Sequence, residues 1–225
     1  MLFRSFAGNL GETQQFTVST LDDAVLEGSE TFGVGLSASN ALITDSDTGT
    51  GTITDNDSAQ VTVDDVSSAE GGGLLFTVTL DNAVQGGFSV AVTLSGGTAT
   101  GGTAPLAYPE DYVTAVTDLV FAGTAGETQQ FTVATLDDAV LESSETFGVA
   151  LSTSNVLVTD SDTGTGTITD NDSAAITVNA VSSAEGSDLT FTVTLDNAVQ
   201  GGFTVNITPA DVSATGGVTG VNNYG

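Results

Sequence analysis

Carboxylates are almost the only side chains in this sequence that could do chemistry. The 225 residues include 29 Asp and Glu but a single Lys or Arg, no His and no Cys, which gives a formal charge of −28. Without Lys, His or Cys, the chain lacks Schiff-base amines and nitrogen or sulfur ligands for zinc. Carboxylates suit hard cations that bind through oxygen, calcium above all. The same charge excludes nucleic acids and anionic membrane surfaces as partners.

Eight acidic residues of segment 58–172 cluster in turns and at the ends of predicted strands. They are Glu70, Asp111, Asp137, Asp138, Glu142, Glu145, Asp170 and Asp172. Two like charges about 4 Å apart cost about 4 kcal/mol at an effective dielectric near 20. Calcium takes roughly six to eight oxygens, so several ions that share carboxylates would relieve this repulsion. The alternative is that these are solvated turn residues, because Asp and Asn favour turns.

A long internal repeat organises these positions. Residues 8–57 and 123–172 differ at only eight of fifty positions, and residues 76–88 return unchanged as 191–203, both at an offset of 115. A period of this length is a whole domain rather than a solenoid repeat. We therefore predict a C-terminal half-unit over 1–57, a complete unit over 58–172 and an N-terminal half-unit over 173–225. A neighbouring subunit or a longer chain would complete the two halves.

Alternation of apolar residues with Thr or Ser predicts an all-β fold. Phe76–Leu80 and Phe88–Leu94, for example, each have one apolar and one polar face, as strands of a sandwich do. About seven antiparallel strands are predicted in the complete unit, which is typical of an Ig-like sandwich; they lie near 60–66, 74–80, 88–95, 111–121, 127–136, 144–152 and 164–169. The repeat then joins such sandwiches end to end. The expected core residues are Phe76, Phe88, Phe121, Phe131 and Phe147.

Three motifs together resemble the Calx-beta domain. They are Asp-Asp-x3-Glu-x2-Glu over 137–145, the triplet Asp170-Asn171-Asp172, and Ala-Glu-Gly over 184–186 before Phe191-Thr-Val-Thr-Leu195. That family includes the regulatory domains of sodium–calcium exchangers and long bacterial surface arrays. The resemblance implies Ca²⁺, with more than one ion per complete unit, held by the eight acidic residues above. In the half-units it implies the ligands Asp22, Asp23, Glu27, Glu30, Asp55, Asp57 and Glu185.

Three functions remain open. The first is a structural protein of a bacterial cell surface: an extracellular fibre, matrix or adhesin stalk stiffened by Ca²⁺ at its junctions, with copies of itself as head-to-tail partners and an unidentified surface ligand. The second is a regulatory calcium sensor of the exchanger type. A hydrolase with a carboxylate pair is the third, but the chain has no Trp and only three Tyr to stack on sugars. Near-identical tandem units favour the structural, non-enzymatic role.

Overall fold

The computed structural model describes residues 4–210. These residues form strands joined by turns and loops, with no helix among them. The described residues therefore contain no helix that is long and apolar enough to cross a membrane. Their contacts divide them into two compact units. The first comprises residues up to Asp138 together with Ser144–Thr169, and the second comprises Ala139–Ser143 together with the residues from Asp170.

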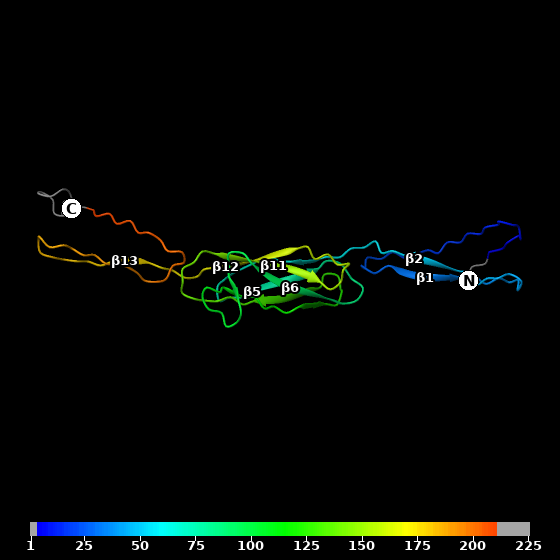
Figure 1. Cartoon of the computed structure of the whole chain (residues 1–225), viewed down its shortest axis with the longest axis horizontal. Coiled ribbons are helices and arrows are strands. Elements are labelled where there is room, and N and C mark those ends of the chain that lie inside the picture. Colours follow the sequence, from blue (N-terminus) through cyan, green and yellow to red (C-terminus); the bar gives the residue numbers. More distant parts are fainter. Residues whose placement is uncertain (1–3, 211–225) are drawn as a thin grey trace. The chain divides into compact units, whose positions relative to one another are not determined.

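The first unit contains a sandwich of two sheets, drawn in cyan to yellow in Figure 1. The larger sheet has the order β4-β12-β11-β6-β9, over Val66–Ala69, Thr163–Thr169, Glu145–Thr153, Phe88–Gly96 and Leu119–Phe121. The smaller sheet has the order β10-β5-β3, over Thr128–Val133, Leu74–Leu80 and Val61–Val63. Neighbouring strands are antiparallel except for β4 and β12, which are parallel. The predicted all-β sandwich is therefore confirmed.

Aromatic side chains join the two sheets. The ring of Phe76 on β5 stacks on Phe131 at 5.1 Å between centroids and meets Phe147 of the larger sheet edge-on at 6.0 Å. Phe88 and Phe121, which lie opposite each other on β6 and β9 of the larger sheet, stack at 5.4 Å. All five are buried, as the alternation predicted. Stacked and edge-to-face pairs of this kind add to the stability that burial alone provides.

Two predicted strands are divided in the structure. The segment 60–66 forms β3 in the smaller sheet and β4 in the larger, with Asp64 and Asp65 between them. Asp64 Oδ1 accepts a hydrogen bond from Thr77 N on β5, and Asp65 Oδ1 accepts one from Thr165 N on β12, both at 2.7 Å. The two carboxylates thus fix the point where the chain passes from one sheet to the other.

The predicted strand 111–121 is divided in the same way. Its first part is β8 (Tyr112–Val113), which pairs in parallel with β7 (Gly101–Gly102), and its last part is β9. The Tyr112 side chain is buried and its ring stacks on Phe147 at 4.3 Å. Tyr112 is therefore a core residue that the alternation did not predict, because its strand is too short to show a period.

A hairpin in the leading segment repeats the register of the sandwich. Strand β1 (Glu30–Gly35) pairs with β2 (Thr48–Ile53), drawn in blue in Figure 1, so that Glu30 lies opposite Ile53. Strands β11 and β12 pair Glu145 with Ile168 in the same way. Near-identical sequence thus gives the same hairpin, although the side chains of the leading copy remain largely exposed.

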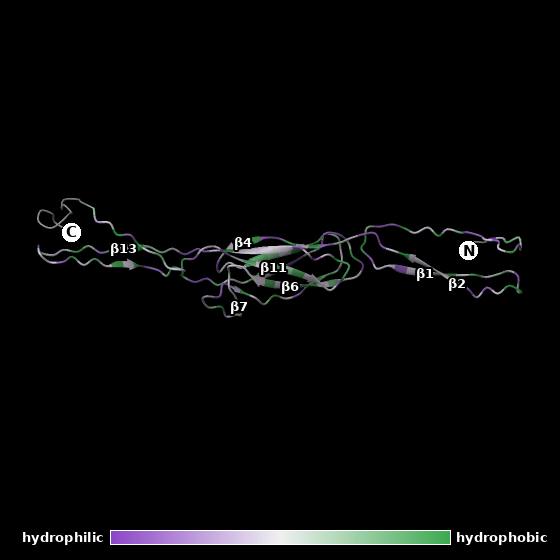
Figure 2. Ribbon diagram, turned by 45° about the horizontal axis from the view of Figure 1, so that its top comes forward, coloured by the Kyte–Doolittle hydropathy of each residue, from purple (hydrophilic) through white to green (hydrophobic). Residues whose placement is uncertain are grey.

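The second unit holds one described antiparallel pair. Strand β13 (Ile176–Val178) pairs with β14 (Val193–Leu195), and Ile176 lies opposite Leu195, in the register of β3 and β5. Both strands are exposed along their whole length, although Figure 2 shows hydrophobic residues along β13. Residues 211–225 of the predicted half-unit 173–225 lie outside the described residues.

Candidate metal centre

The ends of β1 and β2 bring the leading acidic residues together. Glu30 begins β1 and lies opposite Ile53, the last residue of β2. The loop before β1 therefore meets the chain after β2. The six predicted ligands of this segment lie on these two stretches: Asp22, Asp23, Glu27, Glu30, Asp55 and Asp57.

Asp55 organises the meeting point through backbone hydrogen bonds. Its Oδ2 accepts a hydrogen bond from Glu27 N at 3.0 Å, and its Oδ1 accepts one from Asp57 N at 3.4 Å. Asp23 Oδ1 accepts a hydrogen bond from Val25 N at 2.9 Å, which tightens the loop before Glu27. The loop is therefore folded around its own carboxylates.

The leading carboxylates repel one another. Burial raises the pKa of Glu27, and the charges of its neighbours raise this pKa further; these neighbours are Asp23, Glu30, Asp55 and Asp57. Burial also raises the pKa of Asp57, with further contributions from Asp55, Asp22 and Asp23. All six predicted ligands thus belong to one electrostatic cluster, which we call the leading cluster.

The leading cluster is open. In the part of the chain that the structure describes, no three of its carboxylates offer oxygens within 4.8 Å of one another. An ion would have to draw these side chains inward. Arg4 is the chain's one basic residue, and its Nε–H group donates a hydrogen bond to Gln15 O at 2.7 Å.

In the central sandwich, backbone hydrogen bonds bring the corresponding residues close together. Glu70 N donates to Thr169 O at the end of β12, and Gly71 N donates to Leu136 O just before Asp137, both at 3.0 Å. Gly71 lies so close to Asp137 that a Cβ on this glycine would clash with the aspartate side chain. Glu70, Asp137 and the end of β12 are therefore neighbours.

Asp111 joins the same end of the sandwich. Leu136 N donates a hydrogen bond to Asp111 O at 2.9 Å, and Asp111 Oδ2 accepts one from Thr100 N. Carboxylate oxygens of Asp111 and Glu145, the first residue of β11, lie within 4.8 Å of each other. Asp138 directly follows Asp137 in the chain. Five predicted ligands of the complete repeat belong to the first unit: Glu70, Asp111, Asp137, Asp138 and Glu145. They lie at the strand ends that these contacts connect.

The second unit contains the remaining predicted ligands of the complete repeat. Asp170 and Asp172 present oxygens within 4.8 Å of each other, and Asp172 N donates to Asp170 Oδ1 at 3.2 Å. Asp172 Oδ2 is excluded from solvent and accepts no hydrogen bond from any described residue. A buried anionic oxygen without a donor is costly unless a cation binds it. Glu142 also lies in this unit.

Glu185 is separate from these residues. It lies in an exposed turn and belongs to none of the acidic groups that could hold an ion within residues 4–210.

The acidic loop also contacts a turn of the following repeat. Leu26 N donates to Ala83 O, and Gln85 N donates to Leu26 O, each at 2.9 Å. The side chains of Leu26 and Val84 are buried. Gln85 Nε2 donates a further hydrogen bond to Glu27 Oε1 at 3.0 Å. We call this contact the junction.

The second unit repeats the junction at an offset of 115. Leu141 N donates to Ala198 O, and Gln200 N donates to Leu141 O, each at 3.0 Å. Gln200 Nε2 donates to Glu142 Oε1 at 3.0 Å. Gln85 and Leu26 were not among the residues predicted from the sequence. The signal was present, because Ala83-Val84-Gln85 recurs unchanged as Ala198-Val199-Gln200.

Comparison with known protein families identifies the repeat. The sequence model of the Calx-beta domain matches residues 8–67 and 53–180. This chain belongs to the Calx-beta domain family. The match begins within the predicted half-unit 1–57 and extends past the end of the predicted complete unit 58–172, so the Calx-beta chain carries the family pattern across both. No curated protein matches it.

Solved structures that resemble the Calx-beta chain include the apo-form Calx CBD1 domain. The TM-score is 0.43 and the identity 22%, over 52% of this chain and 100% of that one. The calcium binding domain CBD12 of CALX1.1 gives a TM-score of 0.43 and 24% identity over 52% of this chain and 50% of the other. CBD12 from CALX1.2 gives a TM-score of 0.41 and 24% identity over 52% of this chain and 48% of the other. This chain thus spans about half the length of the two CBD12 structures.

Proposed function

We propose that this Calx-beta chain binds calcium through the carboxylates at the ends of its sandwich strands. The observation that carries the proposal is the gathering of the leading cluster, in which Asp55 Oδ2 accepts a hydrogen bond from Glu27 N at 3.0 Å. Burial, and then the charges of neighbouring carboxylates, raise the pKa values of Glu27 and Asp57. A single basic residue in the whole chain leaves this charge to be balanced from outside. An all-oxygen set of carboxylates is the chemistry that calcium prefers.

The complete repeat is proposed to hold more than one ion. Its ligands would be the eight acidic residues predicted from the sequence: Glu70, Asp111, Asp137, Asp138, Glu142, Glu145, Asp170 and Asp172. Each ion takes roughly six to eight oxygens, and bridging carboxylates let two ions share ligands. The unpartnered oxygen of Asp172 supports its place in this set.

The role we favour is that of a structural module in an extracellular array, in which calcium stiffens the junctions between repeats. Two observations support this role. Glu27 belongs to the leading cluster and also accepts the hydrogen bond of Gln85 in the following repeat. The same arrangement recurs at Glu142 and Gln200. An ion that fixes Glu27 would therefore also restrict the junction.

A regulatory calcium sensor is the second candidate, and membership of the Calx-beta family favours it. Affinity separates the two roles. Sites in extracellular modules fill at about 10⁻⁴ to 10⁻³ M calcium, whereas sensor sites are half-filled at about 10⁻⁷ to 10⁻⁵ M.

Isothermal titration of the full chain with calcium tests this proposal. Millimolar or submillimolar affinity with more than one ion per chain is expected for the structural role. Micromolar affinity would favour the sensor, and the absence of a saturable heat would contradict calcium binding altogether.

A further inference from the structure

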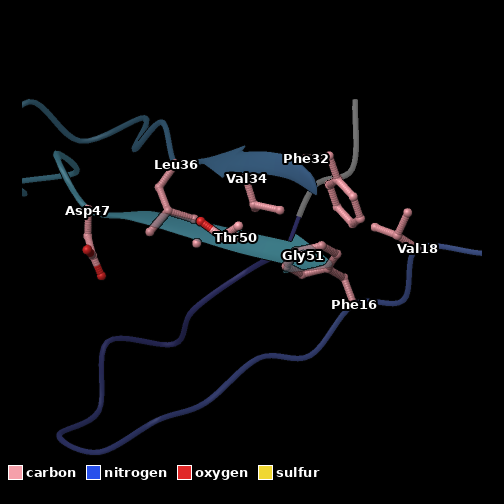
Figure 3. Close-up of a pocket in the computed structure, with 9 residues that line it drawn as sticks. Phe16, Val18, Phe32, Val34, Leu36, Asp47, Thr50 and Gly51 are labelled. Carbon is pink, nitrogen blue, oxygen red and sulfur yellow. The ribbon is translucent and has the colours of Figure 1, made fainter. Parts of the chain in front are cut away.

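The leading hairpin carries an open apolar groove. Phe16 and Val18 face Phe32, Val34 and Leu36 of the hairpin across it, as Figure 3 shows. The exposed fractions are 44% for Phe16, 48% for Val18 and 60% for Leu36. Soluble proteins rarely expose a contiguous apolar face unless another surface covers it.

The central sandwich shows what covers the same residues in a complete repeat. Phe131, Val133 and Phe147 correspond to Phe16, Val18 and Phe32 at the offset of 115, and all three are buried. Strand β5 covers them: it pairs with β10 so that Phe131 lies opposite Phe76. The Phe76 ring also meets Phe147. The groove is therefore the surface that β5 covers in the central sandwich.

The second unit carries a copy of the β5 sequence. Phe191, Val193 and Leu195 correspond to Phe76 and its alternate neighbours on β5. Their exposed fractions are 57%, 40% and 40%, whereas Phe76, Val78 and Leu80 have 0%. Since residues 76–88 and 191–203 are identical, the second unit presents a side-chain set that already fits this surface in the central sandwich.

Charge favours the same two segments as the place of contact. A chain with a formal charge of −28 repels a second copy over most of its surface. Residues 13–18 and 189–195 contain no charged side chain. An association between copies therefore meets little repulsion where these two segments touch, and Asp47 is the one charged side chain that lines the groove.

We propose that residues 189–195 of one copy add a strand to the groove of a second copy. The pairing follows β10 and β5, which places Phe191 opposite Phe16 and Leu189 opposite Val18. Backbone hydrogen bonds along the added strand give affinity, and the alternating pockets give register. Groove and strand lie on different parts of the chain, so the contact is heterologous and propagates head to tail. The inference rests on packing and does not require calcium.

Two single substitutions each disrupt one side of the interface. Phe16→Asp places a charge in the groove and leaves the strand unchanged, whereas Phe191→Asp places a charge on the strand and leaves the groove unchanged. Both residues lie outside the central sandwich. Leu42→Asp is the matched control, since Leu42 is 92% exposed and its counterpart Leu157 is also exposed in the complete repeat, at 48%.

Light scattering with size-exclusion chromatography gives the mass of each full-length protein in calcium and in EDTA. We expect the unmodified chain and Leu42→Asp to form species whose mass grows with concentration, and each interface variant alone to remain a monomer. An equimolar mixture of Phe16→Asp and Phe191→Asp should give a discrete dimer, because one intact groove meets one intact strand. Misfolded variants would not form this dimer when they are mixed.

Three results would overturn the proposal: an unmodified chain that stays monomeric, interface variants that assemble like the unmodified chain, or a mixture that yields no dimer. The calcium titration is read separately, so either proposal can fail while the other stands.

Discussion

Gln85 Nε2 donates a hydrogen bond to Glu27 Oε1 at 3.0 Å, and Gln200 Nε2 donates one to Glu142 Oε1 at the same distance, 115 residues later in the chain. In both pairs the acceptor belongs to an acidic loop and the donor to the turn after a strand of the next repeat. The carboxylate proposed to bind calcium therefore also holds the neighbouring repeat. Ion binding and the order of the junction should be coupled.

Removing the buried leucine of the junction should release the leading hairpin. Leu26 is 5% exposed, and truncation of a buried leucine costs about 2 to 5 kcal/mol. Leu26→Ala should therefore speed amide hydrogen exchange over 25–35, measured by mass spectrometry, and leave the central sandwich unchanged. Leu21→Ala is the control, because Leu21 is 99% exposed. Equal protection in the two variants would show that the junction does not order the hairpin.

Asp172→Asn should weaken calcium binding selectively. The substitution removes charge from a solvent-excluded oxygen that accepts no hydrogen bond from a described residue. We expect about a tenfold loss of calcium affinity, or about 1.4 kcal/mol, in a calorimetric titration. In chelator the same variant should be no less stable, since an uncompensated anionic oxygen has been removed. Asp118→Asn, which removes an exposed carboxylate elsewhere, should leave the affinity unchanged.

Glu127 should stabilise the central sandwich only above acidic pH. Its carboxylate accepts hydrogen bonds from the backbone N–H groups of Ala122 at 2.9 Å, Gly123 at 3.0 Å and Thr124 at 3.3 Å. These bonds, that from Ala122 above all, hold its pKa below the usual 4.5. The contribution is therefore present above pH 4.5 and is lost as the pH falls through the lowered pKa.

Glu127→Gln should thus cost about 1 kcal/mol at pH 7, the lower end for a bond to a charged group that is partly exposed. Urea unfolding in chelator at pH 7 and near pH 3 measures the difference, which should be smaller at the lower pH. Asp188→Asn, at an exposed position, serves as the control. A loss of unfolding free energy that is independent of pH would show that Glu127→Gln acts through altered packing rather than through the lost charge.

The alternation of side chains predicted most of the sandwich because each long strand has one buried face. Strand β5 illustrates this, since Leu74, Phe76, Val78 and Leu80 are buried in turn. The break between β3 and β4 was not predictable from period, because it depends on Asp64 and Asp65 bonding to strands of different sheets. The parallel pairing of β4 with β12 is likewise a tertiary contact between distant segments.

The acidic residues were easier to select than to arrange. Composition and spacing drew attention to the eight proposed ligands of the complete unit, and the resemblance to the Calx-beta domain added those of the half-units. Nothing in the sequence ranked Asp172, whose unpartnered oxygen depends on the folded chain. Nor did the sequence distinguish Glu185, which lies in an exposed turn apart from the others. The predicted boundaries of the three segments and the ligand set as a whole remain predictions.

Thermal unfolding of the full chain in calcium and in EDTA decides whether the carboxylates form ion sites. At about a hundredfold excess over the dissociation constant, bound calcium should stabilise the folded state by about 2.7 kcal/mol per site, which raises the midpoint by several degrees. For extracellular-type sites this needs calcium of about 10 mM or more, and magnesium at the same concentration controls for ionic strength. A midpoint raised by calcium well beyond the magnesium control is the expected result. Equal midpoints in calcium, magnesium and EDTA would contradict calcium binding.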